Sequence, residues 1–101
     1  MITKDDAVRA AADAAIRYAI PRNSERVEAR WRERVGTDGD WVVTSAGTGA
    51  SAFWQDQEID DNGCHLVIDG ELGSVLELEL QRLTLSRDDL ERMRERRVAG
   101  G

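Results

Sequence analysis

Apolar positions recur along this chain with two spacings, three to four residues near its start and two residues farther on. From Thr3 to Pro21 the apolar side chains return every three or four residues, which is the spacing of one helical face. Thr3 and Asp6 resemble a capping box, and Pro21 disfavours the helical conformation of the residue before it. We therefore expect a first helix over residues 3–20. Its apolar face is expected to comprise Val8, Ala12, Ala15 and Ala19, flanked by Ala11, Ile16 and Tyr18.

A second helix is expected to begin after Asn23 or Ser24, either of which can cap it, and to end near Gly36, a typical C-terminal signal. Its apolar stripe consists of Val27, Trp31 and Val35. Arginine recurs at every fourth position, as Arg22, Arg26, Arg30 and Arg34. Such a ridge could bind phosphate or an acidic partner. A solvated face, balanced by nearby glutamates or by acidic strands of the same molecule, is the favoured interpretation.

After Gly36 the spacing changes to two residues, which indicates β-strands. The strongest alternation lies between Val75 and Leu85, where leucines alternate with Glu77, Glu79 and Gln81. One face of that strand should therefore be buried and the other wet. Turn residues separate the strand-like segments, which cover residues 41–44, 51–59, 64–69 and 75–85. The pattern predicts a four-stranded antiparallel meander.

A last helix is expected to begin at Arg87, because Ser86 and Asp89 form a second capping box and Leu85 can pack on Leu90 as a hydrophobic staple. Few apolar residues follow, and residues 98–101 are expected to be a disordered tail. The predicted fold class is thus α+β, in a single domain over residues 1–97. It comprises two N-terminal helices, the four-stranded antiparallel meander and a short C-terminal helix.

Charge is distributed unevenly over the 101 residues, whose net charge is −6. The segment Gly36–Gln81 contains ten carboxylates and no Lys or Arg, whereas the segments on either side each have a net charge of +2. An acidic chain of this kind is a poor direct binder of nucleic acid, because neutralising phosphates needs a surplus of basic residues. It suits a basic protein partner.

Cysteine usage and hydropathy bear on the compartment. One cysteine cannot form an internal disulfide, which fits a reducing environment. No stretch approaches the roughly 20 apolar residues of a membrane span, and the N-terminal residues lack the pattern of a signal peptide. We expect a cytoplasmic protein that does not bind membranes.

Three arrangements resemble chemical sites, and each has a simpler explanation. Cys64 and His65 are adjacent, but neighbours in a strand point to opposite faces, so they cannot readily act as nucleophile and base. Acidic pairs two residues apart in a strand lack the apolar surroundings that would separate their pKa values. Calcium-loop spacing occurs at Glu58, Asp60, Asn62, Gly63 and Asp69, yet the flanks alternate as strands do, whereas helices flank a calcium loop. No catalytic residue, metal or cofactor is expected.

Three short segments resemble small bacterial immunity proteins of the YrhB-like type. They are Ile2-Thr3-Lys4-Asp5-Asp6-Ala7, Gly39-Asp40-Trp41-Val42-Val43, and Leu66-Val67-Ile68-Asp69 followed by Gly73-Ser74-Val75. The resemblance implies a stoichiometric inhibitor that neutralises a toxin and has no catalytic residues of its own.

The leading hypothesis is therefore a non-enzymatic binding protein of immunity or anti-defence type. Its acidic sheet would engage a basic surface on a nuclease or another nucleic-acid-handling protein. Trp41 and Trp54 can each be core residues, but an exposed tryptophan beside carboxylates is typical of a binding hot spot. The alternative is a self-assembling phage or operon-encoded module, in which the basic ridge of one copy meets the acidic sheet of another. The predicted partner-binding residues are Trp54, Asp56, Glu58, Asp60, Asp61, Glu77 and Glu79.

Overall fold

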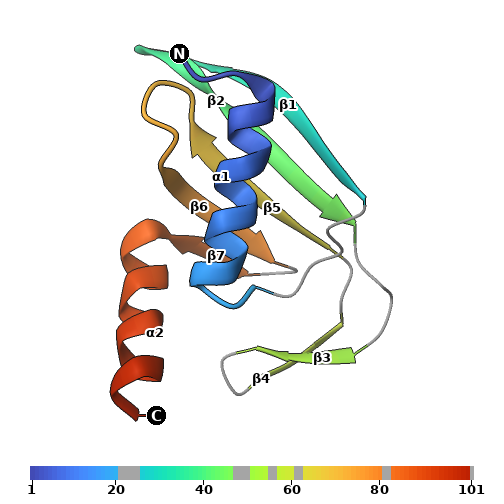
Figure 1. Ribbon diagram of the computed structural model, residues 1–101, viewed down its shortest axis with the longest axis vertical. Helices are drawn as coiled ribbons and strands as arrows, with labels where there is room; N and C mark the ends of the chain where they lie inside the picture. Colours follow the sequence, from blue (N-terminus) through green and yellow to red (C-terminus); the bar gives the residue numbers. More distant parts are fainter. Residues whose placement is uncertain (21–25, 47–50, 55–56, 61–62, 81–82, 101) are drawn as a thin grey trace.

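The computed structural model describes residues 1–20, 26–46, 51–54, 57–60, 63–80 and 83–100, with the side chains of 37–38, 51–60 and 98–100 excepted. The chain begins with one helix, continues through strands and closes with a second helix (Figure 1). The elements are α1 (Lys4–Arg17), β1 (Val27–Arg34), β2 (Thr37–Ala46), β3 (Ser51–Trp54), β4 (Gln57–Asp60), β5 (Gly63–Asp69), β6 (Val75–Leu80), β7 (Leu83–Ser86) and α2 (Arg87–Gly100).

Five of the strands form one antiparallel sheet in the order β1-β2-β5-β6-β7. β3 and β4 pair only with each other among the described strands and form a separate hairpin between β2 and β5. Figure 1 shows this hairpin projecting from the end of the sheet at which β2 ends and β5 begins. Its two ends are held together by the sheet, because Ala46 and Gly63 are register partners.

The core lies between one face of this sheet and the two helices. Val43, Leu66 and Leu78 are successive register partners across β2, β5 and β6, and all three are fully buried. α1 crosses this face (Figure 1), and Leu90 of α2 is buried in the same cluster. Alternation along the strands therefore decides which side chains join the core and which lie on the other face.

α1 begins as predicted, with the Thr3 hydroxyl accepting from the Asp6 backbone N–H and the Asp6 carboxylate accepting from that of Thr3. The predicted apolar face was wrong in its rotation, because Ile16 is 80% exposed. Small side chains let the helix lie close to the sheet, and this determines which side faces inward. The buried residues of α1 are Ala7, Ala11, Ala14 and Ala15.

The predicted second N-terminal helix was wrong, because residues 27–34 form strand β1. Its apolar residues Val27 and Trp31 are four apart, which fits one helical face, but they are also an even number apart and share a strand face with Ala29. Glu, Arg and Ala favour helices. Pairing with β2 outweighs that preference, since Ala29 and Trp31 lie opposite Val43 and Trp41.

The predicted four-stranded meander was also wrong. The segments predicted as single strands, residues 51–59 and 75–85, are each divided into two, with β3 and β4 over residues 51–60 and β6 and β7 over residues 75–86. The connections at Gln55-Asp56 and Gln81-Arg82 have no glycine, proline or Asn-Gly pair, so the sequence gives no strong turn signal there. The α+β class with an antiparallel sheet is confirmed.

α2 begins as the capping box predicts: the Asp89 carboxylate accepts from the Ser86 backbone N–H, and the Ser86 hydroxyl accepts from the Asp89 backbone N–H. Leu90 is 1% exposed, and Leu85 packs against the same cluster. Neither helix in the described part of the chain is long and apolar enough to cross a membrane.

Candidate functional site

The sheet face opposite the helices, hereafter the open face, is built from side chains that alternate with those of the core. Cross-strand partners share a face, so Arg30, Val42, Val67 and Glu77 form one row across β1, β2, β5 and β6. The described residues of this face are Glu28, Arg30, Arg32, Asp40, Val42, Thr44, His65, Val67, Asp69, Glu77, Glu79, Thr84 and Ser86.

Charge on the open face changes from one edge of the sheet toward the other. The edge strand β1 carries the exposed Glu28, Arg30 and Arg32 on this face, whereas β6 carries the half-buried Glu77 and Glu79. Between them, Val42 is 7% and Val67 is 2% exposed, although neither belongs to the core cluster beneath the helices. Long side chains flank these valines in the register, and their aliphatic stems can cover apolar neighbours. The face thus has an edge strand of mixed charge, two nearly buried valines with polar and acidic residues on either side of them at its centre, and an acidic strand at β6.

Asp40 is a charged residue of this face that is almost completely buried. Its side chain is 1% exposed, and its Oδ2 atom lies 3.2 Å from Arg34 Nη1 and 3.6 Å from Arg32 Nη2. Oδ2 makes no hydrogen bond of good geometry within the described structure. Two positive charges therefore compensate the buried carboxylate, which would otherwise be costly to bury. Part of the arginine series thus neutralises an acid of the same sheet.

The predicted site residues fall into two groups. Glu77 and Glu79 lie on the open face, in register with Val67 and His65. Trp54, Glu58 and Asp60 lie in the β3–β4 hairpin, whose backbone alone is described, while Asp56 and Asp61 lie outside the described residues. The first group lies at the acidic side of the open face. That the second group belongs to the same binding surface stays a prediction.

Cys64 and His65 point to opposite faces of β5, as their place in a strand predicts. Cys64 is 2% exposed in the core, whereas His65 is exposed and its Nδ1 lies 2.8 Å from the Thr44 hydroxyl oxygen. The calcium-like spacing between Glu58 and Asp69 lies within strands β4 and β5 themselves, and no helix of the described chain adjoins it. Among the described residues, no group of three or more His, Cys, Asp or Glu is arranged to hold a metal ion.

Sequence reasoning missed an apolar groove where the first residues of the chain meet β1 and β2. Trp31 and Trp41 are register partners whose rings meet edge to face, with centroids 5.2 Å apart and planes at 74°. Trp41 Nε1 donates to the Ile2 carbonyl at 3.3 Å. With Met1, Ile2 and Thr3 the two rings line a groove of about 770 Å³. The two-residue spacing of Val27, Ala29 and Trp31 could have predicted a strand here. Pairing of that strand with the next one would have placed both tryptophan rings on one face.

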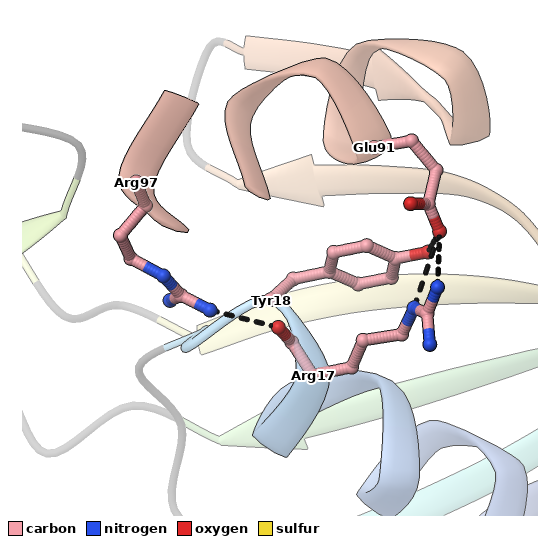
Figure 2. A network of polar contacts seen from close by, with 4 residues as sticks. All are labelled: Arg17, Tyr18, Glu91 and Arg97. Atoms are coloured by element: carbon pink, nitrogen blue, oxygen red, sulfur yellow. Dashed lines mark hydrogen bonds and ion pairs between the residues drawn. The ribbon is translucent and has the colours of Figure 1, made fainter. Parts of the chain in front are cut away.

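The two helices are joined by a polar network on the core side, shown in Figure 2. Glu91 Oε1 accepts from Arg17 Nε at 3.1 Å, from Arg17 Nη2 at 3.0 Å and from the Tyr18 hydroxyl at 2.6 Å. Arg97 Nη2 donates to the Arg17 carbonyl at the end of α1 at 2.9 Å. The Tyr18 and Arg17 bonds lower the pKa of Glu91, and burial together with the Glu91 bond raises the pKa of Tyr18. The network holds α2 against α1.

Comparison of the chain with protein-family models, with curated proteins and with solved structures found no match. The assignment of function therefore depends on the residues and their geometry.

Proposed function

We propose that this protein is a non-enzymatic protein-binding module, a stoichiometric inhibitor of immunity or anti-defence type. Its acidic side engages a basic surface of a nuclease or another nucleic-acid-handling protein. The observation that carries the proposal is the position of Glu77 and Glu79, which lie together on a sheet face that neither helix packs against. The resemblance of three short segments to YrhB-like immunity proteins points to the same kind of function.

The charge layout supports a partner of this chemistry. A nucleic-acid-handling protein presents a basic surface to phosphates, and an acidic surface of matching shape can occupy it instead. Carboxylates raise the rate of association and select the partner, whereas a buried aromatic anchor supplies more of the affinity. Glu77 and Glu79 take the electrostatic role in this proposal, together with Asp56, Glu58, Asp60 and Asp61. Trp54 is the proposed anchor.

Reversing the two glutamates tests the proposal. Wild type and the Glu77→Lys, Glu79→Lys double variant are used to capture proteins at low salt, and the captured protein is identified, purified and titrated. We expect the wild type to bind one basic protein in a 1:1 ratio and to block its nucleic-acid contacts. The double variant should bind it at least about tenfold more weakly, because like charges then face each other.

The matched control is Asp13→Lys with Glu95→Lys, which makes the same change of net charge at exposed positions on the helices. This control should bind as the wild type does. Equal binding by the wild type and by the Glu77→Lys, Glu79→Lys variant at low salt would show that the open face is not the binding surface.

A further inference from the structure

β1 lies at one edge of the sheet (Figure 1), and none of the described strands pairs with its outer side. The Arg26 carbonyl accepts from the Ala46 backbone N–H at 2.9 Å, so the backbone of Arg26 points toward β2. In an antiparallel pair this direction alternates from one residue to the next. The N–H and C=O groups of Val27, Ala29 and Trp31 therefore point outward, away from β2.

This outer side is long enough to take up a further strand. β1 has eight residues, and its pairing is regular as far as Arg32, after which the register shifts. β7, at the opposite edge, has four residues and leads directly into α2. An extended peptide that adds to a sheet edge binds through main-chain hydrogen bonds, and alternate side chains select its sequence. β1 is the edge better suited to such a peptide.

The side chains of β1 differ in chemistry between the two faces of the sheet. The three residues whose backbone points outward are apolar and half-buried on the side that faces the helices. Glu28, Arg30 and Arg32 are exposed on the open face. Among the described residues Arg30 has no ion-pair partner, and Arg32 shares the Asp40 carboxylate with Arg34. A strand beside β1 thus meets one negative and two positive side chains on one face and apolar side chains on the other.

We propose that β1 binds an extended segment of a partner protein as an additional antiparallel strand. The charged residues of this segment are acidic opposite Arg30 and Arg32 and basic opposite Glu28. Its alternate residues are apolar and lie beside Ala29 and Trp31. Antiparallel addition continues the pattern of the sheet, whose described pairs are all antiparallel. The inference goes beyond the proposed function and does not rest on it, because it uses none of the proposed partner-binding residues.

The charges of β1 also determine which strands the edge rejects. Charged residues on an edge strand discourage pairing with apolar or like-charged strands. Two-fold registers that pair most of β1 with β1 of a second copy are centred on one of residues 29–31. The first joins Glu28 to Arg30 of the second copy but sets Arg26 opposite Arg32, and the other two set arginine opposite arginine. A separate segment with the complementary order of charges avoids these contacts.

Fluorescence anisotropy of a labelled synthetic peptide tests the proposal. The probe has the core Glu-Val-Glu-Val-Lys-Val, which lies opposite residues 32 to 27 of β1 in that order. The wild type should bind it with half-saturation below about 1 mM. The peptide with exchanged charges, Lys-Val-Lys-Val-Glu-Val, should bind at least about tenfold more weakly, because like charges then face each other at three positions.

Amide hydrogen exchange of the wild type, followed by NMR, locates the bound peptide. The N–H groups of Ala29 and Trp31 point outward and should exchange about tenfold more slowly when the probe is present at about ten times its Kd. The N–H of Arg30 points toward β2, so the probe should leave its exchange unchanged.

Variants separate the backbone of the edge from its charge. Ala29→Pro removes an outward N–H, a position at which an edge strand tolerates proline, so it should fold, as urea unfolding checks, and lose the probe. Arg30→Glu keeps the backbone edge. It should bind the probe about fivefold more weakly and the peptide with exchanged charges more tightly. The matched control Arg96→Glu, at an exposed position of α2, should bind both peptides as the wild type does.

Three results would overturn the proposal. They are no binding of the probe to the wild type up to about 1 mM, equal binding of the two peptides, and binding that Ala29→Pro leaves intact. Sedimentation of the protein alone provides a fourth, because a wild-type dimer that Ala29→Pro dissociates would identify a second copy as the occupant of the edge. None of these results affects the partner titration, which depends on Glu77 and Glu79.

Discussion

The ring of Trp31 shows how single residues determine the end of the sheet. It lies directly over the backbone of two glycines, so that a Cβ atom at Gly39 would be 2.6 Å from Trp31 Cζ2 and one at Gly70 would be 2.7 Å from Trp31 Cη2. These distances leave no room for a methyl group. The ring also meets Trp41 edge to face, an arrangement that stabilises aromatic pairs. Both glycines are therefore required for the position of Trp31.

Alanine substitutions at Gly36 and Gly39 separate backbone strain from this steric requirement. Both glycines have a positive φ, +85° at Gly36 and +125° at Gly39, but a Cβ at Gly36 meets nothing within 4 Å. Gly36→Ala should lower the free energy of unfolding by about 1 kcal/mol, from the strained φ alone. Gly39→Ala adds overpacking against both the Trp31 ring and the Arg32 carbonyl oxygen, which would also lie 2.6 Å from the new Cβ, and should lower it by about 2–4 kcal/mol. Urea unfolding measures both, and equal losses would contradict the steric requirement at Gly39.

At the scale of helices and strands, the sequence predicts what local chemistry determines. Thr3 with Asp6, and Ser86 with Asp89, mark the two helix starts correctly, because a cap depends on residues three positions apart. β5 is predicted within one residue, since the Asn62-Gly63 pair marks its start.

The other elements depend on pairing between segments that are distant in the chain, and the local sequence pattern contains no information about that pairing. Residues 27–34 have helix-favouring composition, yet β2 offers backbone partners and apolar neighbours that a helix there would lose. Arg30 was therefore predicted to lie on a helical ridge rather than on the open face. Glu77 and Glu79 were placed on the face opposite the core leucines by strand alternation alone. Sequence reasoning could therefore place a residue of the candidate site only where it had already identified the strand that carries it.

α2 depends on its polar network more than on its apolar contacts, because Leu90 alone is fully buried among its described side chains. Bonds from Tyr18 and Arg17 lower the pKa of Glu91. A lowered pKa means that the folded state favours the carboxylate, so this stabilisation is present above the ordinary pKa near 4 and is lost as pH falls through the lowered value. Acid should therefore loosen α2 first.

Glu91→Gln tests this role. The variant should have a lower unfolding temperature than the wild type at neutral pH, and the difference should shrink as pH falls below about 4. Hydrogen exchange should show faster exchange in α2 at neutral pH, while β2 and β5 keep their protection. Glu95→Gln, on the exposed side of the same helix, should leave both measurements unchanged. A temperature difference that stays constant with pH would exclude the ionised carboxylate as the cause.

At the scale of the whole molecule, the chain consists of a closed framework and an inserted hairpin. β1, β2, β5, β6 and β7 form the sheet and, with both helices, the core. Because Ala46 and Gly63 are already register partners, the chain could connect β2 to β5 directly there. The framework carries Glu77 and Glu79, whereas the insertion carries the other predicted partner-binding residues.

Replacing residues 47–62 by Asn-Gly tests whether these two parts contribute separately. A two-residue Asn-Gly turn suits a β-hairpin, and shortening the connection from 16 residues to two reduces the entropy of closing it by roughly 2 kcal/mol. The shortened protein should therefore unfold at an equal or higher urea concentration. If Trp54 anchors the partner, its binding should weaken by at least about 2 kcal/mol, a typical loss for a hot-spot residue. Loss of folding would contradict the independence of the framework, whereas unchanged partner binding would confine the binding site to the sheet.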